Sequence, residues 1–161
     1  MPNIEEVKID FPEGCNVILG YSHFIKTVED LYEIIVTNRP DAKFAIAFSE
    51  ASSERLIRYD GNSKELIDIA VGNMKKLSAG HTFLIILENV FPISILNQIK
   101  ACQEIGRIFA ATANPLYALV YRNKQGGGIV GVIDGMSPLG VEDNTAKENR
   151  KDLLRKIGYK K

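Results

Sequence analysis

The chain has 161 residues, 45% of them hydrophobic and 25% charged, which are the proportions of an ordinary soluble globular protein. This length fits one domain, residues 1–161, with a core of useful size. Twenty basic and twenty acidic residues give a formal net charge of zero, which argues against nucleic acid as a partner because general nucleic-acid binders carry a basic excess.

The apolar runs are far too short to span a bilayer, and the first residues do not resemble a signal peptide. We therefore expect a cytoplasmic protein with no membrane partner. The two cysteines, Cys15 and Cys102, lie far apart and near no second ligand pair, so we expect reduced thiols and not a disulfide framework. The two histidines have none of the spacings typical of metal sites, and the sequence therefore predicts no transition-metal site and argues against zinc.

Alternating apolar residues and helix-capping patterns predict the elements in chain order. The first half contains strands over 3–11 and 17–20, a helix over 27–38 with Thr27 as N-cap, strands over 43–49 and 55–59, and a helix over 63–77 that opens with Asn62 and Glu65 in capping-box spacing. The second half contains a strand over 81–87, a helix over 92–101, strands over 107–113, 116–121 and 128–133, and a helix over 145–157 opened by Thr145 and Glu148. Strand–helix–strand units mixed with hairpins predict the α/β class: a single-domain α/β sandwich with a mixed sheet.

The segment 20–31, GYSHFIKTVEDL, joins a buried strand to a helix and carries the most chemistry. His23 lies just before the helix, where unpaired N–H groups and the helix dipole favour an anion. Three roles remain open for it: a phosphate-accepting nucleophile, a general acid or base, or a structural histidine at a strand end. Lys26 supplies a countercharge for an anion at His23, whereas Glu29 and Asp30 would repel a phosphate placed directly on the first turn.

Polar residues also follow three of the predicted strands. Glu50 and Ser52 come after the strand over 43–49, at the kind of strand end where α/β proteins often bind ligands, although a plain turn explains them equally well. Asp134 ends the last strand and is suited to a ribose, a metal or a turn. The small residues before Asn114 permit close approach of a purine whose edge the amide can contact, but they also suit tight sheet packing.

Two further patterns have ordinary explanations. The glycines over 126–131 match the dinucleotide pattern G-x-G-x-x-G, but a strand pattern follows them where a helix is required, so we interpret them as a hairpin turn. The segment 147–161 contains seven basic residues, which suits a solvated helix face better than a site for an anion, an acidic partner or RNA. His81 precedes an apolar strand and is best interpreted as a core histidine.

Taken together, several segments resemble the adenosine-specific kinase family of archaea and bacteria. The matching stretches are SHFIKTVEDL (22–31), FSEAS (48–52), GHTF (80–83), IFAATANP (108–115), GIVGVIDG (128–135), PLGVE (138–142) and LRKIGY (154–159). The resemblance covers nearly the whole chain. It implies a compact α/β domain that binds adenosine or AMP, a histidine that carries phosphate, and a homo-oligomer, either a trimer or a multiple of one.

Carried onto this sequence, the resemblance makes His23 the phosphate acceptor. If the protein is an enzyme, we expect Lys26 to neutralise the phosphate and Glu50 or Asp134 to orient the ribose or act as base. We predict that the nucleotide contacts come from a set of polar residues and one glycine: Ser22, Thr27, Ser52, Asn114 and Gly135. No cofactor is specified, although a nucleotide phosphate donor would bring Mg²⁺ with it. The sequence leaves two hypotheses open, a phosphotransferase acting on adenosine and a non-catalytic sensor of AMP or adenosine.

Overall fold

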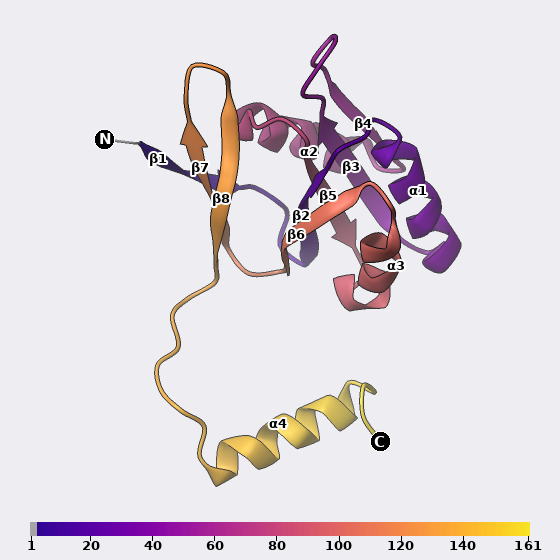
Figure 1. Ribbon diagram of the computed structural model, residues 1–161. Helices are drawn as coiled ribbons and strands as arrows, with labels where there is room; N and C mark the ends of the chain where they lie inside the picture. Colours follow the sequence, from indigo (N-terminus) through magenta and orange to yellow (C-terminus); the bar gives the residue numbers. More distant parts are fainter. Residues whose placement is uncertain (1–2) are drawn as a thin grey trace.

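The computed structural model describes residues 3–161 (Figure 1). In chain order the elements are β1 (Ile4–Ile9), β2 (Cys15–Ser22), α1 (Thr27–Asn38), β3 (Lys43–Ser49), β4 (Ile57–Gly61), α2 (Lys64–Leu77), β5 (Thr82–Glu88), a 3₁₀ turn η1 (Pro92–Ser94), α3 (Leu96–Ala101), β6 (Ile105–Thr112), β7 (Leu116–Arg122), β8 (Gly127–Asp134) and α4 (Asn144–Lys156). The predicted α/β class is confirmed. None of the helices within residues 3–161 has the length and apolar character needed to cross a membrane.

The strands form two open sheets, one of five strands in the order β4-β3-β5-β2-β6 and one of three in the order β1-β7-β8. Every pairing between these strands is antiparallel, so the expected mixed sheet is wrong. The physical reason is that none of the helices in residues 3–161 joins two neighbouring parallel strands: β2 and β3 flank α1 but are separated in the sheet by β5.

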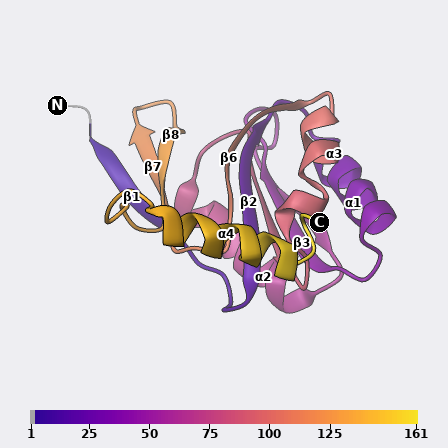
Figure 2. The ribbon, with the colours of Figure 1, turned by 90° about the horizontal axis from the view of Figure 1, so that it is seen from below.

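The five-stranded sheet is buried on both faces, which explains the continuous apolar runs of its central strands β2, β3 and β5 (Figures 1 and 2). One face packs against α1 and α3, with Phe44, Phe48 and Phe83 among its fully buried side chains. The other face packs against α2 and the three-stranded sheet. Burial on both faces holds the ends of the central strands in fixed positions, and the candidate site lies at one of these ends.

The helices begin and end close to the predicted residues, but their caps differ. The N-cap of α1 is Lys26 and has no side-chain cap, because the Thr27 hydroxyl donates back to the Phe24 carbonyl. Ser63 caps α2 by accepting from the Leu66 N–H, while the Asn62 amide bonds the backbone of β3 and its preceding turn. Asp143 caps α4 in place of Thr145 because it already accepts from the Ala146 N–H.

The predicted helix over 92–101 is divided into two parts. The 3₁₀ turn η1 opens it at Pro92, and α3 begins only at Leu96. Between the two parts Ile95 departs from helical geometry, with φ −129° and ψ −6°, and its side chain is fully buried against the five-stranded sheet. The packing of the Ile95 side chain in the core therefore interrupts a helix that the sequence predicts as continuous.

The C-terminal segment leaves the body of the molecule. An extended connection over 135–143 leads to α4, which has no buried residue and stands clear of the two sheets in Figure 1. Met136, Leu139 and Val141 on this connection are 94%, 106% and 99% exposed. We call residues 136–161 the C-terminal arm.

Candidate functional site

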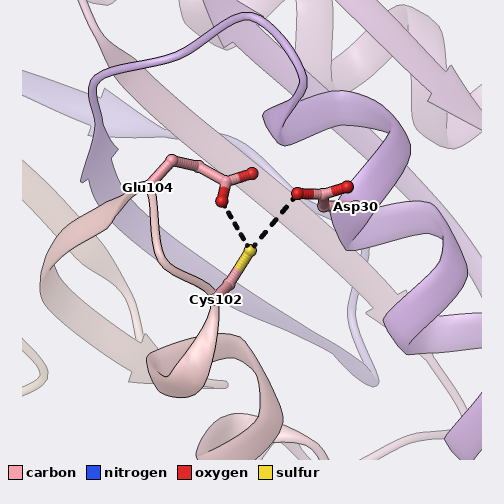
Figure 3. A group of neighbouring side chains, drawn as sticks. All are labelled: Asp30, Cys102 and Glu104. Carbon is pink, nitrogen blue, oxygen red and sulfur yellow. Dashed lines mark hydrogen bonds between the residues drawn. The ribbon is translucent and has the colours of Figure 1, made fainter.

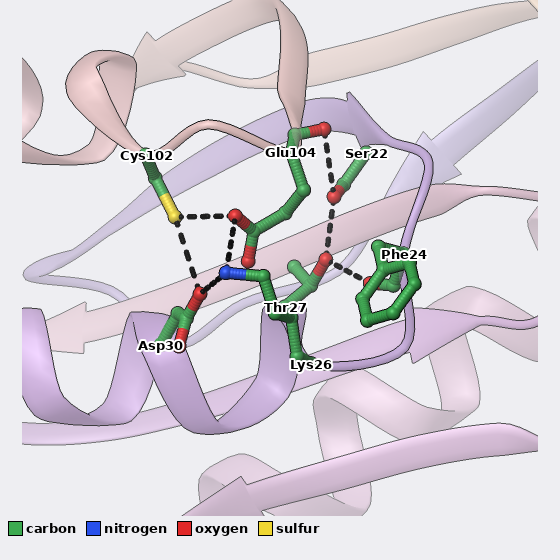
Figure 4. Close-up of polar contacts among 7 residues, drawn as sticks. All are labelled: Ser22, Phe24, Lys26, Thr27, Asp30, Cys102 and Glu104. Carbon is green, nitrogen blue, oxygen red and sulfur yellow. Dashed lines mark hydrogen bonds and ion pairs between the residues drawn. The ribbon is translucent and has the colours of Figure 1, made fainter.

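His23 lies on the turn between β2 and α1. The buried hydroxyls of Ser22 and Thr27, drawn in Figure 4, fix this turn. Ser22 and Thr27 are fully buried and bond to each other through their side-chain oxygens. Ser22 also donates to the Glu104 carbonyl at 3.1 Å. The His23 backbone N–H donates to that same carbonyl oxygen, also at 3.1 Å. The turn is therefore anchored to β6, and the anchoring leaves the His23 side chain exposed.

The imidazole of His23 makes no hydrogen bond to any side chain or backbone group within residues 3–161. An exposed ring on a well-anchored turn can meet a ligand without breaking an internal contact. Ser22 and Thr27, by contrast, use their hydroxyls inside the protein, where they shape the turn.

Lys26 is held by two carboxylates. Its ammonium lies 2.5 Å from Asp30 on the next turn of α1 and 3.3 Å from Glu104, which is only 1% exposed. The hydrogen bond to Asp30, followed by that to Glu104, raises the pKa of Lys26, so the side chain is fully charged at neutral pH. An anion at His23 would compete with both carboxylates for this ammonium.

Cys102 shares this environment and faces both acidic groups (Figure 3). Its Sγ lies 3.0 Å from Glu104 and 3.8 Å from Asp30. Burial, reinforced by the contact with Glu104, raises the pKa of the Cys102 thiol to about 12, so the group is a neutral donor at physiological pH. Burial alone would raise the pKa of Asp30, but the hydrogen bonds to Lys26 and Glu104 outweigh it and lower that pKa.

His81 connects the His23 turn to the end of β3. The backbone N–H of His81 donates to the Ser49 carbonyl at 2.7 Å, and the backbone carbonyl of His81 accepts from the Ser22 N–H at 2.9 Å. Its ring stacks on Phe48 and meets Tyr21 edge-on. His81 is therefore half-buried against two aromatic rings and is not the core histidine that the sequence predicts. Its backbone brings the ends of β2 and β3 together.

A cleft of about 810 Å³ begins at this end of β3. Glu50 lines it together with the loop up to Ile57, the C-terminal end of α2 and the glycines over 126–128. These glycines form a hairpin that leads into strand β8, so the rejection of the dinucleotide pattern is confirmed. Ser52 lies in the same loop and is exposed.

Glu50 itself is tied down inside the cleft. One carboxylate oxygen accepts from the Leu56 N–H at 2.8 Å, and the other accepts from Arg58 at 2.9 Å. These two contacts lower the pKa of Glu50. A carboxylate of this kind stays ionised at neutral pH, so it suits the binding of a hydroxyl better than proton abstraction.

Asp134, Asn114 and Gly135 form a second group at the opposite end of the sheet. Asp134 accepts from Thr112 at 2.8 Å and from the Asn114 amide at 3.2 Å, and Gly135 turns the chain with φ +66°. Because Thr112 pairs with Val17 while Ile105 pairs with Ser22, the two groups are separated by the length of β2. At the usual rise per residue this is roughly 16 Å.

Sequence reasoning missed Glu104, Cys102 and Arg58. Cys102 and Glu104 contact Asp30 and Lys26, which lie more than seventy residues earlier, and Arg58 contacts Glu50 across a strand pair, so none belongs to a local motif. A useful signal was present for Glu104, since a lone acidic residue between the predicted helix over 92–101 and a strand must find a partner if the chain buries it.

The structure therefore defines an α/β protein with an exposed histidine on an anchored turn, and the backbone of His81 links this turn to the end of β3, where an open cleft begins. The family model described as adenosine specific kinase matches residues 7–160, and the chain belongs to this family. The crystal structure of the PH1918 protein from Pyrococcus horikoshii OT3 is 40% identical in sequence and superimposes with a TM-score of 0.95 over 100% of this chain and 99% of that chain. No match was found among the curated proteins.

Proposed function

We propose that this protein binds adenosine or AMP and transfers a phosphoryl group to or from adenosine through His23. The observation that carries the proposal is the exposed imidazole of His23 on a turn held by buried hydrogen bonds, in a chain of the adenosine-specific kinase family. Histidine is a suitable acceptor because its neutral imidazole is nucleophilic near pH 7.

The proposed reaction has two in-line steps. In the first, an imidazole nitrogen of His23 forms a bond to phosphorus as the bond from phosphorus to the donor's leaving oxygen breaks. In the second, the 5′ oxygen of adenosine forms a bond to the same phosphorus, the phosphorus–nitrogen bond breaks, and the hydroxyl proton leaves to water. Two displacements at one nucleophile predict ping-pong kinetics.

The contacts of the other predicted residues determine the roles that we assign to them. Glu50 is ionised and fixed, and we assign it to the ribose hydroxyls, with Ser52 in the same loop as a further contact. Lys26 contributes to the phosphate only when its ammonium leaves Asp30 and Glu104. Ser22 and Thr27 support the site by fixing the turn.

Asn114, Asp134 and Gly135 cannot reach an adenosine bound near His23 of the same chain, because the two groups lie at opposite ends of β2. They can contribute in a homo-oligomer, where this end of one copy approaches the His23 end of another. We propose such an assembly, with the C-terminal arm as its contact, and expect a trimer or a multiple of one.

The arm supports this assembly in two ways. It exposes apolar side chains that its own body does not cover, among them Leu139, Val141 and Leu153. The arm, residues 136–161, carries seven basic and four acidic residues, whereas residues 1–135 carry thirteen basic and sixteen acidic ones, so arm and body have opposite net charges. A second copy offers both the acidic surface and exposed apolar residues such as Ile4, Tyr121 and Ile133 on its small sheet.

Two measurements test the function. Calorimetry should show tighter binding of adenosine and AMP than of guanosine, and equal affinities or no binding would remove adenosine from the proposal.

Intact-mass spectra of protein incubated with nucleotide triphosphates and Mg²⁺ should show a phosphorylated form that His23→Ala lacks. Adenosine binding with no phosphorylated form under any donor would favour the non-catalytic sensor, and phosphate on a histidine of the His23→Ala protein would move the acceptor to His81.

A further inference from the structure

Asp30, Cys102 and Glu104 bring three metal-binding atoms together beside α1 (Figure 3). We call these three residues the thiol–carboxylate cluster. Asp30 comes from the first turns of α1, and the other two come from the turn between α3 and β6. One atom from each residue lies within 4.8 Å of the other two.

The distances inside the cluster match the edges of a metal coordination sphere. Zinc bonds of about 2.3 Å to sulfur and about 2.0 Å to oxygen place these atoms about 3.5 Å apart at the tetrahedral angle. The Cys102 sulfur lies 3.0 Å from Glu104 and 3.8 Å from Asp30, on either side of that value. A small adjustment of side chains would therefore place all three atoms around one ion.

Glu104 supplies an independent sign that the cluster lacks a ligand. Its side chain is 1% exposed, and its Oε1 atom is buried with no hydrogen-bond partner. A buried carboxylate oxygen without a partner is costly, and a bound cation is one of the few groups that relieve that cost.

The charges around the cluster also favour a bound cation. The carboxylates of Asp30 and Glu104 both contact one ammonium, that of Lys26 (Figure 4). This ammonium occupies the place that a metal ion would take between them. The Lys26 side chain is 35% exposed, so it can turn outward without crossing the core. The charged groups around the cluster are thus Asp30, Glu104 and Lys26, with the Cys102 thiol between the two acids.

We infer that the thiol–carboxylate cluster is a binding site for one divalent transition metal of the zinc class, which displaces the ammonium of Lys26. This inference departs from the expectation of no transition-metal site, which rested on the spacing of the histidines, because the three ligands come from distant parts of the sequence. Two carboxylate oxygens and one thiolate form a ligand set of mixed softness that suits Zn²⁺ better than Mg²⁺, which prefers oxygen alone. Water completes the fourth position, since three protein ligands leave one site open.

Binding is a substitution without any redox change. The S–H bond of Cys102 breaks, its proton goes to solvent, and the sulfur electron pair forms the bond to the metal. The Lys26 ammonium keeps its proton and moves to solvent. The inference goes beyond the proposed function, because neither adenosine nor His23 takes part in the metal site.

Cobalt tests the site, because Co²⁺ substitutes for Zn²⁺ and absorbs in the near ultraviolet when bound to thiolate. We expect the reduced full-length protein, stripped with a chelator, to bind one Co²⁺ per chain with this absorption, and added Zn²⁺ to abolish it. Cys102→Ser should lose the absorption, while Cys15→Ser, which changes the other thiol, should keep it. Lys26→Met should tighten binding at least tenfold because it removes the competing ammonium.

Two further variants separate this site from the phosphate chemistry. Asp30→Asn should weaken Co²⁺ binding at least tenfold, and His23→Ala should leave it unchanged whether or not the protein carries phosphate. The inference is overturned if no thiolate absorption develops, if the absorption survives in Cys102→Ser, or if His23→Ala removes it. An unchanged affinity in both Lys26→Met and Asp30→Asn would also overturn it.

Discussion

At the scale of single residues, His81 has a backbone conformation that few L-residues adopt. Its φ of +59° is held by hydrogen bonds to Ser49 and Ser22, and its ring packs on Phe48. The sequence predicted a core histidine from the apolar strand that follows, whereas the ring is half-buried. The left-handed backbone could not be predicted, because it depends on contacts with two other strands.

Replacing His81 should therefore affect stability more than binding. We expect His81→Ala to lose about 1 kcal/mol of unfolding free energy as the ring contacts disappear. For a chain of this size that corresponds to a fall in Tm of about 2–4 °C. His23→Ala serves as the control, because its exposed ring should leave Tm nearly unchanged. A His81→Ala protein with full stability but impaired adenosine binding would show that His81 belongs to the site.

Glu50 provides a prediction about pH. Its folded pKa is lowered from 4.5 by the Leu56 N–H and by Arg58, so its contribution to stability is present above pH 4.5 and is lost as the pH falls through the folded pKa. The unfolding free energy of Glu50→Gln should thus lie below that of the wild-type protein at pH 7, with the difference shrinking below pH 4.5. Denaturant titrations across pH 3–7 measure it.

The matched control is Glu54→Gln, which removes the more exposed of the two carboxylates bound to Arg58 and leaves the Glu50 contacts in place. Its difference from the wild-type protein should be smaller at every pH. If Glu50→Gln and the wild-type protein lose stability in parallel as the pH falls, the contacts of Glu50 do not stabilise the folded state.

At the scale of elements, the helix bounds followed the sequence well because apolar periodicity is local. The helix over 27–38 has the predicted ends, whereas its cap does not, since the Thr27 hydroxyl finds a carbonyl in the preceding turn. The mixed sheet was mispredicted for a related reason. Strand order depends on which strands meet in space, and β5 enters between β2 and β3 only in the folded chain.

Ser63 is the cap whose loss should be measurable. It accepts from the Leu66 N–H at the start of α2, a helix packed on the central sheet. We expect Ser63→Ala to cost about 1 kcal/mol in chemical denaturation, and Ser63→Asp to retain most of that stability because aspartate also caps. Equal losses in the two variants would show that packing around Ser63, and not capping, is responsible.

In the candidate site, too, local patterns could be predicted from the sequence and long-range contacts could not. His23 was found because strand, histidine and helix follow one another within a dozen residues. The thiol–carboxylate cluster joins Asp30 to residues about seventy positions later, so no spacing rule could indicate it. The separation of Asp134 from Glu50 by the length of β2 was equally hidden, because both simply follow strands in the sequence.

At the scale of the whole molecule, the C-terminal arm is a shared feature of two structures. The superposition on the PH1918 protein covers 100% of this chain with a TM-score of 0.95. A score this high requires the arm to have a similar position in both structures. An arm of this length held in one place away from its own body needs something to hold it. In the assembly that we propose, a second copy does so, and the opposite net charges of arm and body would favour this contact.

Substitutions in the extended connection test this assembly in the intact chain. Light scattering should give the mass of an oligomer for the wild-type protein and that of a monomer for the double variant Leu139→Glu with Val141→Glu. Both side chains are almost fully exposed within one chain, so the change should leave the fold of the body and its circular dichroism intact. Their effect arises only where a second copy would bury them, because a buried carboxylate without a partner is strongly unfavourable.

Thr37→Glu, which adds a carboxylate to the exposed face of α1, is the control for charge alone and should remain oligomeric. Raising the ionic strength should also weaken the wild-type assembly, since salt screens the attraction between a basic arm and an acidic body. If the double variant keeps the wild-type mass, the arm does not hold the copies together. Asn114, Asp134 and Gly135 would then have no route through this contact to an adenosine bound beside His23.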